Sequence, residues 1–229
     1  MKRAVIIVAG GKGLRMGGEL SKQFIPLNGK PVLMHTLEVF HRWDSSARLI
    51  LVLPEAHQSY WDMLCRELKC NIPHKIVSGG ETRFHSVQNG LREAADCDLI
   101  GIHDGVRPFV TPEVIETCFR TAGEKGAVMA VVPSIDSLRE KIGDQNRAVD
   151  RRNFYIVQTP QVFYRDWLLE AYKQPYQPDF FDDATVVEHN GKTIHLIEGN
   201  LENIKITTPI DILYAELFVN HSNILTGSY

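Results

Sequence analysis

Residues 4–16 read Ala-Val-Ile-Ile-Val-Ala-Gly-Gly-Lys-Gly-Leu-Arg-Met. The first six are apolar and mostly β-branched, which is typical of a buried strand in a parallel sheet. In the glycine run that follows, backbone N–H groups can approach an anion closely, and Lys12, Arg15 and Lys22 add positive charge. The stretch predicts a strand that leads into a phosphate-binding loop. The plainer alternative is a glycine-rich turn with solvated cations.

Similar apolar runs recur along the chain, and segments with helical spacing separate them. The runs lie at 48–53, 74–77, 98–102 and 127–132. This alternation predicts an α/β fold with a doubly wound, mostly parallel sheet. Two later runs, 192–198 and 203–207, predict two more strands before a last amphipathic helix at 209–220. Thr-Pro pairs at 111–112 and 208–209 predict helix starts.

The stretch 134–152 breaks this alternation because it is polar, rich in turn-forming residues and only weakly strand-like. It predicts an arm that protrudes from the body of the protein rather than a linker. With 229 residues, 44% of them hydrophobic, the chain is long enough to bury one core. We therefore expect a single domain over 1–229.

Charge and cysteine content argue against several classes of protein. The formal net charge is −3 and the basic residues are scattered, so neither nucleic acid nor an anionic membrane surface is an expected partner. The four cysteines follow no metal or redox spacing and are expected to be free thiols in a reducing compartment. The N-terminus shows neither a signal peptide nor a spanning segment. These features predict a cytoplasmic protein.

In open α/β sheets, ligands bind beyond the carboxyl ends of the strands. Four such ends carry unusual residues, at 10–16, 79–83, 103–108 and 203–209. The first does not fit a P-loop, because Glu19-Leu20 follows Gly17-Gly18 where Lys-Ser or Lys-Thr is needed. It does not fit a dinucleotide fingerprint either, because Met16 stands at the third glycine position. No hydrolase motif is present, so hydrolysis through a nucleophilic side chain is unsupported.

Asp104 follows an apolar strand and precedes Arg107-Pro108. A carboxylate in this place can hold Mg²⁺ against triphosphate oxygens, although it could equally pair with Arg107 or cap the next turn. His103 is expected to be a packing residue, because no zinc set is completed near it.

Together these stretches resemble the methylerythritol phosphate cytidylyltransferase family over about residues 3–218. The matching stretches are Val8 to Met16, Lys22-Gln23, Gly79-Gly80 with Arg83 and Ser86, His103 to Pro108, Thr159-Pro160-Gln161, and Asn203-Ile204-Lys205. The resemblance implies a Rossmann-like nucleotidyltransferase fold. It also implies transfer of CMP from CTP to 2-C-methyl-D-erythritol 4-phosphate, with Mg²⁺, in isoprenoid precursor synthesis.

The resemblance also implies roles for individual residues. Arg15, Lys22 and Lys205 would be catalytic, around the reacting phosphates, and Asp104 would hold the metal. The CTP-binding residues would be Ala9, Gly10, Gly11, Gly13, Gly80, Glu81, Ser86, Asp104 and Gly105. Ser137, Arg151 and Thr159 would face the polyol phosphate, with the arm coming from the partner subunit of a homodimer.

The sequence departs from the family pattern at three places. Gly10 and Ser21 replace residues whose role is carried by the backbone. Phe181 stands where the family has a threonine that meets the polyol phosphate, and a phenylalanine cannot donate that hydrogen bond. Ribitol-5-phosphate cytidylyltransferase, a sister family with the same chemistry, is the alternative. The stretch Val149 to Tyr155 favours the methylerythritol phosphate enzyme, and Phe181 weakens that preference.

Overall fold

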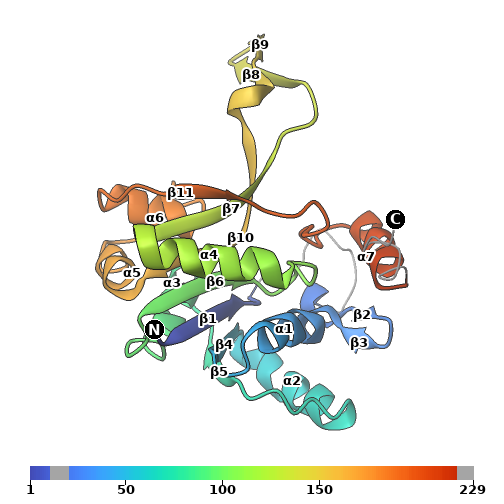
Figure 1. Ribbon diagram of the computed structural model, residues 1–229. Helices are drawn as coiled ribbons and strands as arrows, with labels where there is room; N and C mark the ends of the chain where they lie inside the picture. Colours follow the sequence, from blue (N-terminus) through green and yellow to red (C-terminus); the bar gives the residue numbers. More distant parts are fainter. Residues whose placement is uncertain (11–20, 221–229) are drawn as a thin grey trace.

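The computed structural model describes residues 1–10 and 21–220. At its centre is a seven-stranded sheet in the order β11-β7-β10-β6-β1-β4-β5 (Figure 1). Every strand pair in it is parallel except those of β10, which runs antiparallel to β6 and β7. The strands are β1 (Arg3–Val8), β4 (Arg48–Leu53), β5 (Lys75–Ser78), β6 (Leu99–Asp104), β7 (Ala127–Pro133), β10 (Tyr155–Tyr164) and β11 (His195–Glu198). The predicted doubly wound α/β fold is confirmed.

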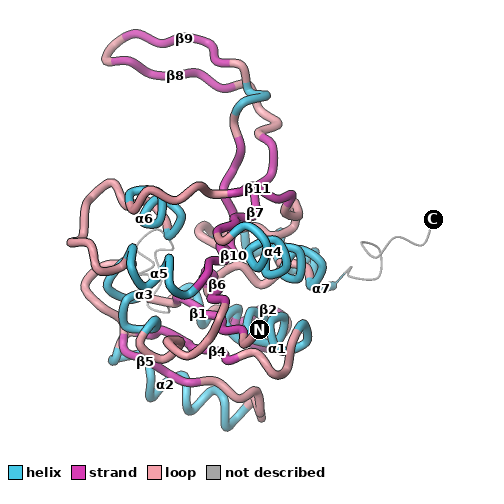
Figure 2. Tube along the Cα trace, turned by 60° about the vertical axis from the view of Figure 1, so that its left-hand side comes forward, coloured by secondary structure: helices cyan, strands magenta, loops and turns pink. Residues whose placement is uncertain are grey.

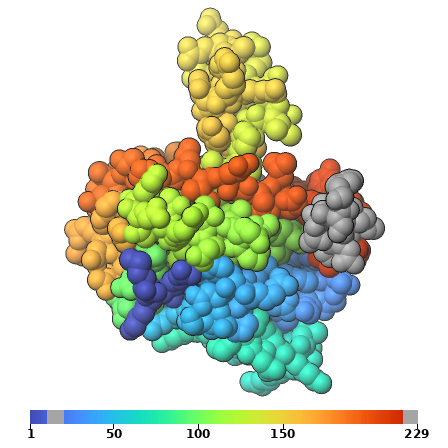
Figure 3. Space-filling model, in the orientation of Figure 1, coloured from blue at the N-terminus to red at the C-terminus, as the bar shows by residue number. Residues whose placement is uncertain are grey.

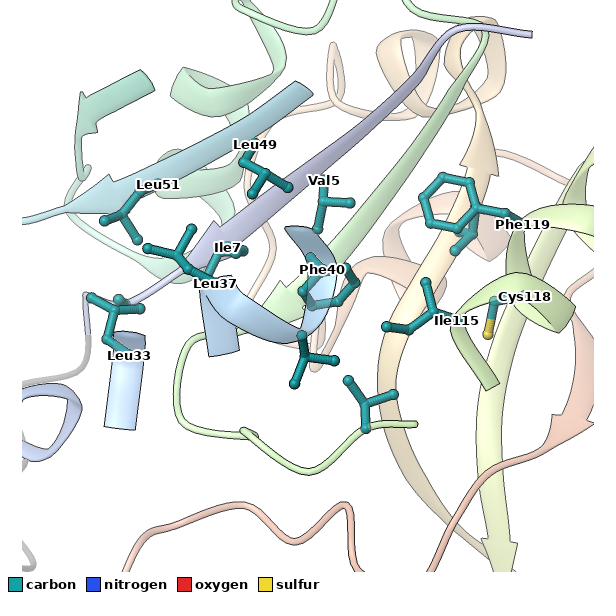
Figure 4. Close-up of a cluster of buried hydrophobic side chains, with 14 of the residues drawn as sticks. Val5, Ile7, Leu33, Leu37, Phe40, Leu49, Leu51, Ile115, Cys118 and Phe119 are labelled. Carbon is teal, nitrogen blue, oxygen red and sulfur yellow. The ribbon is translucent and has the colours of Figure 1, made fainter. Parts of the chain in front are cut away.

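Helices cover both faces of this sheet (Figure 2). The first face packs against α1 (Val32–Trp43), α2 (Glu55–Glu67) and α4 (Pro112–Lys125). The second packs against α3 (Arg83–Leu91), α5 (Arg165–Ala171) and α6 (Asp183–His189). Side chains along a strand point alternately to the two faces of the sheet. Val5 and Ile7 belong to the cluster on the side of α1 and α4 (Figure 4), and Ala4 and Ile6 belong to the cluster on the other face.

The predicted helix starts are both present, but they are capped differently. Thr111 caps α4, its hydroxyl accepting the Val114 N–H at 3.3 Å, as expected. At α7 (Pro209–Asn220), the carboxylate of Asp211 accepts the N–H groups of Thr207 and Thr208 at 2.8 and 2.7 Å. At this helix start, an acidic side chain rather than a hydroxyl accepts the backbone N–H groups of the two residues that precede the helix.

The late part of the chain differs from the prediction. Residues 203–207 do not form the predicted strand, because their polar groups bond loops and side chains instead of a neighbouring strand. The Ile206 N–H donates to the Val106 carbonyl of another loop, and the buried Asn203 amide donates to the Thr159 carbonyl. β10 was not predicted. Its pairing with β7 is interrupted between Val157 and Gln161, and this irregular strand joins the arm to the sheet.

A short helix and a short hairpin follow the first undescribed segment of the chain. Lys22–Phe24 forms the short 3₁₀ helix η2, and β2 (Pro26–Leu27) pairs with β3 (Lys30–Pro31). α7 packs on this hairpin through a separate cluster that contains Leu27, Val32 and Ala215. In the part of the chain that the structure describes, no helix has the length and apolar character needed to cross a membrane.

The arm is an antiparallel hairpin of β8 (Leu138–Ile142) and β9 (Gln145–Val149), followed by the 3₁₀ helix η3 (Arg151–Asn153). It stands out from the body in Figure 1 and in the space-filling view of Figure 3, as the stretch 134–152 predicted. Large apolar side chains are exposed where the arm joins the body, among them Phe154, Tyr155 and Ile156 at 45–54% exposure.

Two phenylalanines at opposite extremes of exposure test whether this core carries the stability. Phe119 is fully buried against Trp43, with ring centroids 4.6 Å apart, whereas Phe181 is 82% exposed. Phe119→Ala should lower the free energy of unfolding by about 3–5 kcal/mol in urea denaturation. The matched Phe181→Ala should change it by less than about 0.5 kcal/mol. Comparable losses in the two variants would contradict this description of the core.

Candidate functional site

The carboxyl ends of four strands meet at one edge of the sheet. Val8 pairs with both Val52 and Asp104, and Leu53 pairs with Ser78, so β1, β4, β5 and β6 end level with one another. The described residues that follow these strands therefore lie side by side. They carry most of the candidate residues within the described ranges.

Gly80 and Ser86 form a compact turn at the start of α3. The Ser86 hydroxyl accepts the Gly80 N–H at 3.0 Å and donates to the Thr82 carbonyl at 2.9 Å. A Cβ at Gly80 would lie 2.5 Å from the Cβ of His85, so a side chain does not fit there. Gly10 lies beside Ser86, since a Cβ on Gly10 would come 3.9 Å from the Ser86 hydroxyl.

Ala9 and Gly105 follow the ends of β1 and β6 and pack closely against each other. The Gly105 N–H donates to the Val8 carbonyl at 2.9 Å, and a Cβ at Gly105 would lie 2.9 Å from the Cβ of Ala9. The structure thus brings Ala9, Gly10, Gly80, Ser86 and Gly105 to one edge, while Glu81 is exposed beside them.

Asp104 lies at the centre of this edge and is only 7% exposed. Its Oδ2 atom is 3.2 Å from Arg107 Nε and 3.0 Å from Lys205 Nζ, and its Oδ1 atom is 3.8 Å from Arg83 Nε. Burial by itself would raise the pKa of Asp104, but Arg83, Lys205 and Arg107 together hold that pKa well below its usual range. The carboxylate is therefore ionised at any pH near neutral.

Arg83 links Asp104 to α6. Its guanidinium donates to both carboxylate oxygens of the buried Asp183, at 2.8 and 2.6 Å, and the Tyr172 hydroxyl donates to the same carboxylate at 2.6 Å. Burial opposes the charge of Arg83, but Asp183 and Asp104 raise its pKa. Three cations thus face two carboxylates, so this cluster carries an excess of positive charge.

Buried polar groups beneath Asp104 fix its backbone. The Asp104 N–H donates to the Thr159 hydroxyl at 3.1 Å, the hydroxyl lies 3.0 Å from His103 Nδ1, and His103 Nε2 lies 3.0 Å from the Arg107 carbonyl. A carbonyl can only accept, so Nε2 carries the proton and Nδ1 accepts from Thr159. Burial lowers the pKa of His103 to about 4, which keeps this neutral tautomer near pH 7. His103 is buried, as a packing residue would be, but it also bonds Thr159 and the Arg107 carbonyl, a role that the sequence did not predict.

Arg107 is held by several carbonyls as well as by Asp104. It donates to the Asn203 carbonyl at 2.7 Å, and the Asn203 amide donates to the Thr159 carbonyl at 2.8 Å. These bonds attach the segment that carries Lys205 to β6 and β10. The Lys205 side chain remains 44% exposed, so its ammonium is anchored on one side and accessible on the other.

The remaining predicted residues fall into three groups. Gly11, Gly13 and Arg15 lie outside the described residues. Lys22 opens η2 and is half-buried. Ser137 and Arg151 belong to the arm, where Arg151 donates to the Ile135 carbonyl, and neither contacts the Asp104 cluster within the described chain.

Thr159 has a different environment from the one expected. It is only 4% exposed, and its hydroxyl is occupied by His103 and by the Asp104 N–H. We therefore interpret Thr159 as a residue that positions Asp104.

Arg83, Arg107 and Asp183 had no role among the predicted site residues, although all three build the cluster. Arg83 and Arg107 stand just after predicted strand ends, as cations of a ligand-binding edge would. Asp183 stands in the stretch 181–184 that resembles the family pattern, but its pairing with Arg83, 100 residues away, had no signal in the sequence.

A metal could be held here only together with a ligand. Within residues 1–10 and 21–220, no group of three His, Cys, Asp or Glu side chains could hold an ion by itself. Mg²⁺ is usually bound by one or two carboxylates plus substrate phosphates. Asp104 fits this requirement, because its Oδ1 is beyond hydrogen-bond distance of Arg83 and can accept a further cation.

Comparisons with known proteins give a consistent result. The family model described as 2-C-methyl-D-erythritol 4-phosphate cytidylyltransferase matches residues 3–221. A protein of that name from Bacteroides thetaiotaomicron is 53% identical over 212 residues, which cover 93% of this chain and 97% of the relative.

Solved structures agree with this match. The 4-diphosphocytidyl-2C-methyl-D-erythritol synthase of Anaerococcus prevotii has a TM-score of 0.82 at 26% identity, covering 96% of this chain and 98% of that one. The 2-C-methyl-D-erythritol 4-phosphate cytidylyltransferase of Thermus thermophilus has a TM-score of 0.76 at 30% identity, covering 96% and 100%.

Replacing the Thr159 hydroxyl tests its place beneath Asp104. Thr159→Val keeps the shape but leaves the Asp104 N–H and His103 Nδ1 without a partner, which should lower the free energy of unfolding by about 1–3 kcal/mol. Thr159→Ser keeps the hydroxyl and should cost less. Urea denaturation of both variants measures the difference, and a larger loss in the serine variant would show that the methyl group matters more than the hydroxyl.

Proposed function

The chain belongs to the 2-C-methyl-D-erythritol 4-phosphate cytidylyltransferase family, and we propose that the cation cluster around Asp104 is where it transfers CMP from CTP to that polyol phosphate. The products are 4-diphosphocytidyl-2-C-methyl-D-erythritol and pyrophosphate. The observation that carries the assignment of the site is the excess positive charge at the sheet edge, beside the turn of Gly80 and Ser86.

The reaction needs charge neutralisation more than it needs a base. A phosphate monoester has a second pKa of about 6, so at pH 7 it is largely a dianion whose oxygen is already a nucleophile. That oxygen attacks the α-phosphorus of CTP, the bond between the α-phosphorus and its bridging oxygen breaks, and pyrophosphate leaves. Repulsion between the anions is the main obstacle, so positioned cations supply most of the catalysis.

The proposed roles of Lys205, Arg83 and Arg107 follow from where each is held, and those of Arg15 and Lys22 follow from the match to the family. Lys205 is fixed by Asp104 on one side and exposed on the other, which suits an ammonium that contacts the α-phosphate as its charge grows. Arg15 and Lys22 would bind the triphosphate and the leaving pyrophosphate. Arg83 and Arg107 would orient Asp104, because each is already bonded to protein groups.

By their match to the family, the residues that would bind CTP are Ala9, Gly10, Gly11, Gly13, Gly80, Glu81, Ser86, Asp104 and Gly105. The Ser86 hydroxyl proton is used on the Thr82 carbonyl. Its remaining lone pair can accept from an amino group such as that of cytosine. The match to the cytidylyltransferase family is the reason to expect cytosine rather than a purine here.

Mg²⁺ is the proposed cofactor, held by Asp104 together with triphosphate oxygens. When bound, it would neutralise charge on the phosphates. Asp104 suits this role because it stays ionised among its cations and its Oδ1, 3.8 Å from Arg83 Nε, is beyond hydrogen-bond distance of that group.

The polyol phosphate would be bound by Ser137 and Arg151. Arginine suits a phosphate because its planar fork can donate two parallel hydrogen bonds. Thr159 would act indirectly, through Asp104. Phe181 offers no hydrogen bond, so the acceptor site in this chain would rely on the arm.

We also propose that the protein is a cytoplasmic homodimer. Exposed Phe154, Tyr155 and Ile156 at the base of the arm support a dimer, because apolar groups of this size are usually covered. An isolated two-stranded hairpin is at best marginally stable in water, which also favours a partner for the arm. The four free cysteines support a reducing compartment.

Pyrophosphate release tests the proposed reaction. With CTP and Mg²⁺, 2-C-methyl-D-erythritol 4-phosphate should be turned over in preference to ribitol 5-phosphate, and EDTA should abolish turnover. CTP should be preferred over ATP and GTP. A preference for ribitol 5-phosphate would assign the chain to the alternative reaction, and equal use of purine nucleotides would refute the base pocket.

Mixing inactive variants tests whether the arm works in trans. Lys22→Ala and Arg151→Ala should each be nearly inactive. If the arms cross, a heterodimer contains one complete site, built from the Lys22 of one chain and the Arg151 of the other. Activity should then recover to about half per heterodimer.

The control for this mixture is Arg152→Ala, since Arg152 pairs with Asp150 on the surface of the arm. It should leave turnover unchanged. A mixture no more active than either parent, with subunit exchange confirmed by mass, would place Arg151 in its own subunit's site.

A further inference from the structure

Helix α2 is not part of the strand-end cluster, yet one of its histidines holds the turn that carries Lys22. The His57 ring lies 3.3 Å from the Ser21 hydroxyl through Nε2 and 3.4 Å from the Gln23 amide nitrogen through Nδ1. Ser21 and Gln23 are the two neighbours of Lys22 in the sequence. One histidine ring therefore contacts the residue before this lysine and the residue after it.

The turn has little stability of its own. η2 contains two backbone bonds, from the Phe24 N–H to the Ser21 carbonyl at 2.9 Å and from the Ile25 N–H to the Lys22 carbonyl at 3.2 Å. A 3₁₀ turn of three residues is too short to hold itself in place. The Ser21 hydroxyl does not cap it, since this hydroxyl contacts His57 instead.

Aromatic packing completes the attachment of the turn to α2. Phe24 is 4% exposed and lies edge-on to His57, with ring centroids 5.5 Å apart, and to Tyr60, at 5.1 Å. It also stacks at 6.3 Å on Trp61, which is fully buried. The helix is itself tied to the sheet edge, where Gln58 donates to the Ser78 hydroxyl at 3.1 Å.

We infer that His57 is a positioning residue for Lys22: it fixes the turn from α2 so that the lysine ammonium meets the triphosphate in a defined place. The inference rests on the proposed role of Lys22 in the reaction. Its physical basis is that a long, flexible side chain can be aimed only as well as its backbone is fixed.

The test is a double-mutant cycle measured on the full-length protein with CTP and the polyol phosphate. His57→Phe keeps the ring against Phe24 and removes both polar contacts. It should lower kcat by roughly 10- to 100-fold, the effect expected of a misplacement of about an ångström. Lys22→Ala should lower kcat by about two to three orders of magnitude. In the Lys22→Ala background, His57→Phe should cause no further loss, because the group through which it acts is gone.

The matched control is His74→Phe. His74 accepts from the Trp61 indole N–H at 3.0 Å, so it packs against the same helix but contacts none of residues 21–24. This variant should lower the melting temperature and leave kcat unchanged. Ser21→Ala removes one contact without disturbing the core and should lower kcat by about fivefold, which keeps the test open if His57→Phe does not fold.

The outcomes separate the two hypotheses. If Lys22→Ala keeps a normal kcat, the proposed role of Lys22 fails, and the positioning role fails with it. If Lys22→Ala is impaired but His57→Phe and Ser21→Ala have normal kcat, only the positioning role is refuted. The same factor of loss from His57→Phe in both backgrounds, or an equal loss of kcat in His74→Phe, would show that α2 matters for folding alone.

Discussion

The buried carboxylate of Asp104 is the group on which the rest of the site depends. A carboxylate that is 7% exposed stays ionised only if cations surround it, and here Arg83, Arg107 and Lys205 do so. These cations come from α3, from the loop after β6 and from the segment before α7. A single charge therefore draws three distant parts of the chain together at the sheet edge.

The polar groups beneath Asp104 make that arrangement rigid. Thr159 and His103 are buried, and each hydrogen-bonding atom has a partner that fits its chemistry. Thr159 lies in the part of β10 where pairing with β7 is interrupted, and its hydroxyl contacts the end of β6 there. The result is a preorganised edge whose cations need little rearrangement when an anion binds.

Around this rigid edge lie segments that are attached from outside. η2 is held by α2 through His57, and the arm projects from β10 with apolar groups exposed at its base. Both proposals about them share one logic. A short turn or a hairpin cannot fix a catalytic side chain by itself, so its position must come from a neighbouring helix or a second subunit.

The sequence by itself determined the layers of the fold, because buried parallel strands and amphipathic helices have distinct periods. Gly80 and Asp104 were placed at the sheet edge because they follow predicted strand ends, whereas Ser86 came from the family resemblance and Lys205 from a predicted strand that the structure does not form. The tertiary structure alone decided the partners of Asp104, the tautomer of His103 and the burial of Thr159. It also decided that 203–207 is not a strand. Those features depend on contacts between residues that are far apart in the chain, such as Arg83 with Asp183, and no local pattern records such contacts.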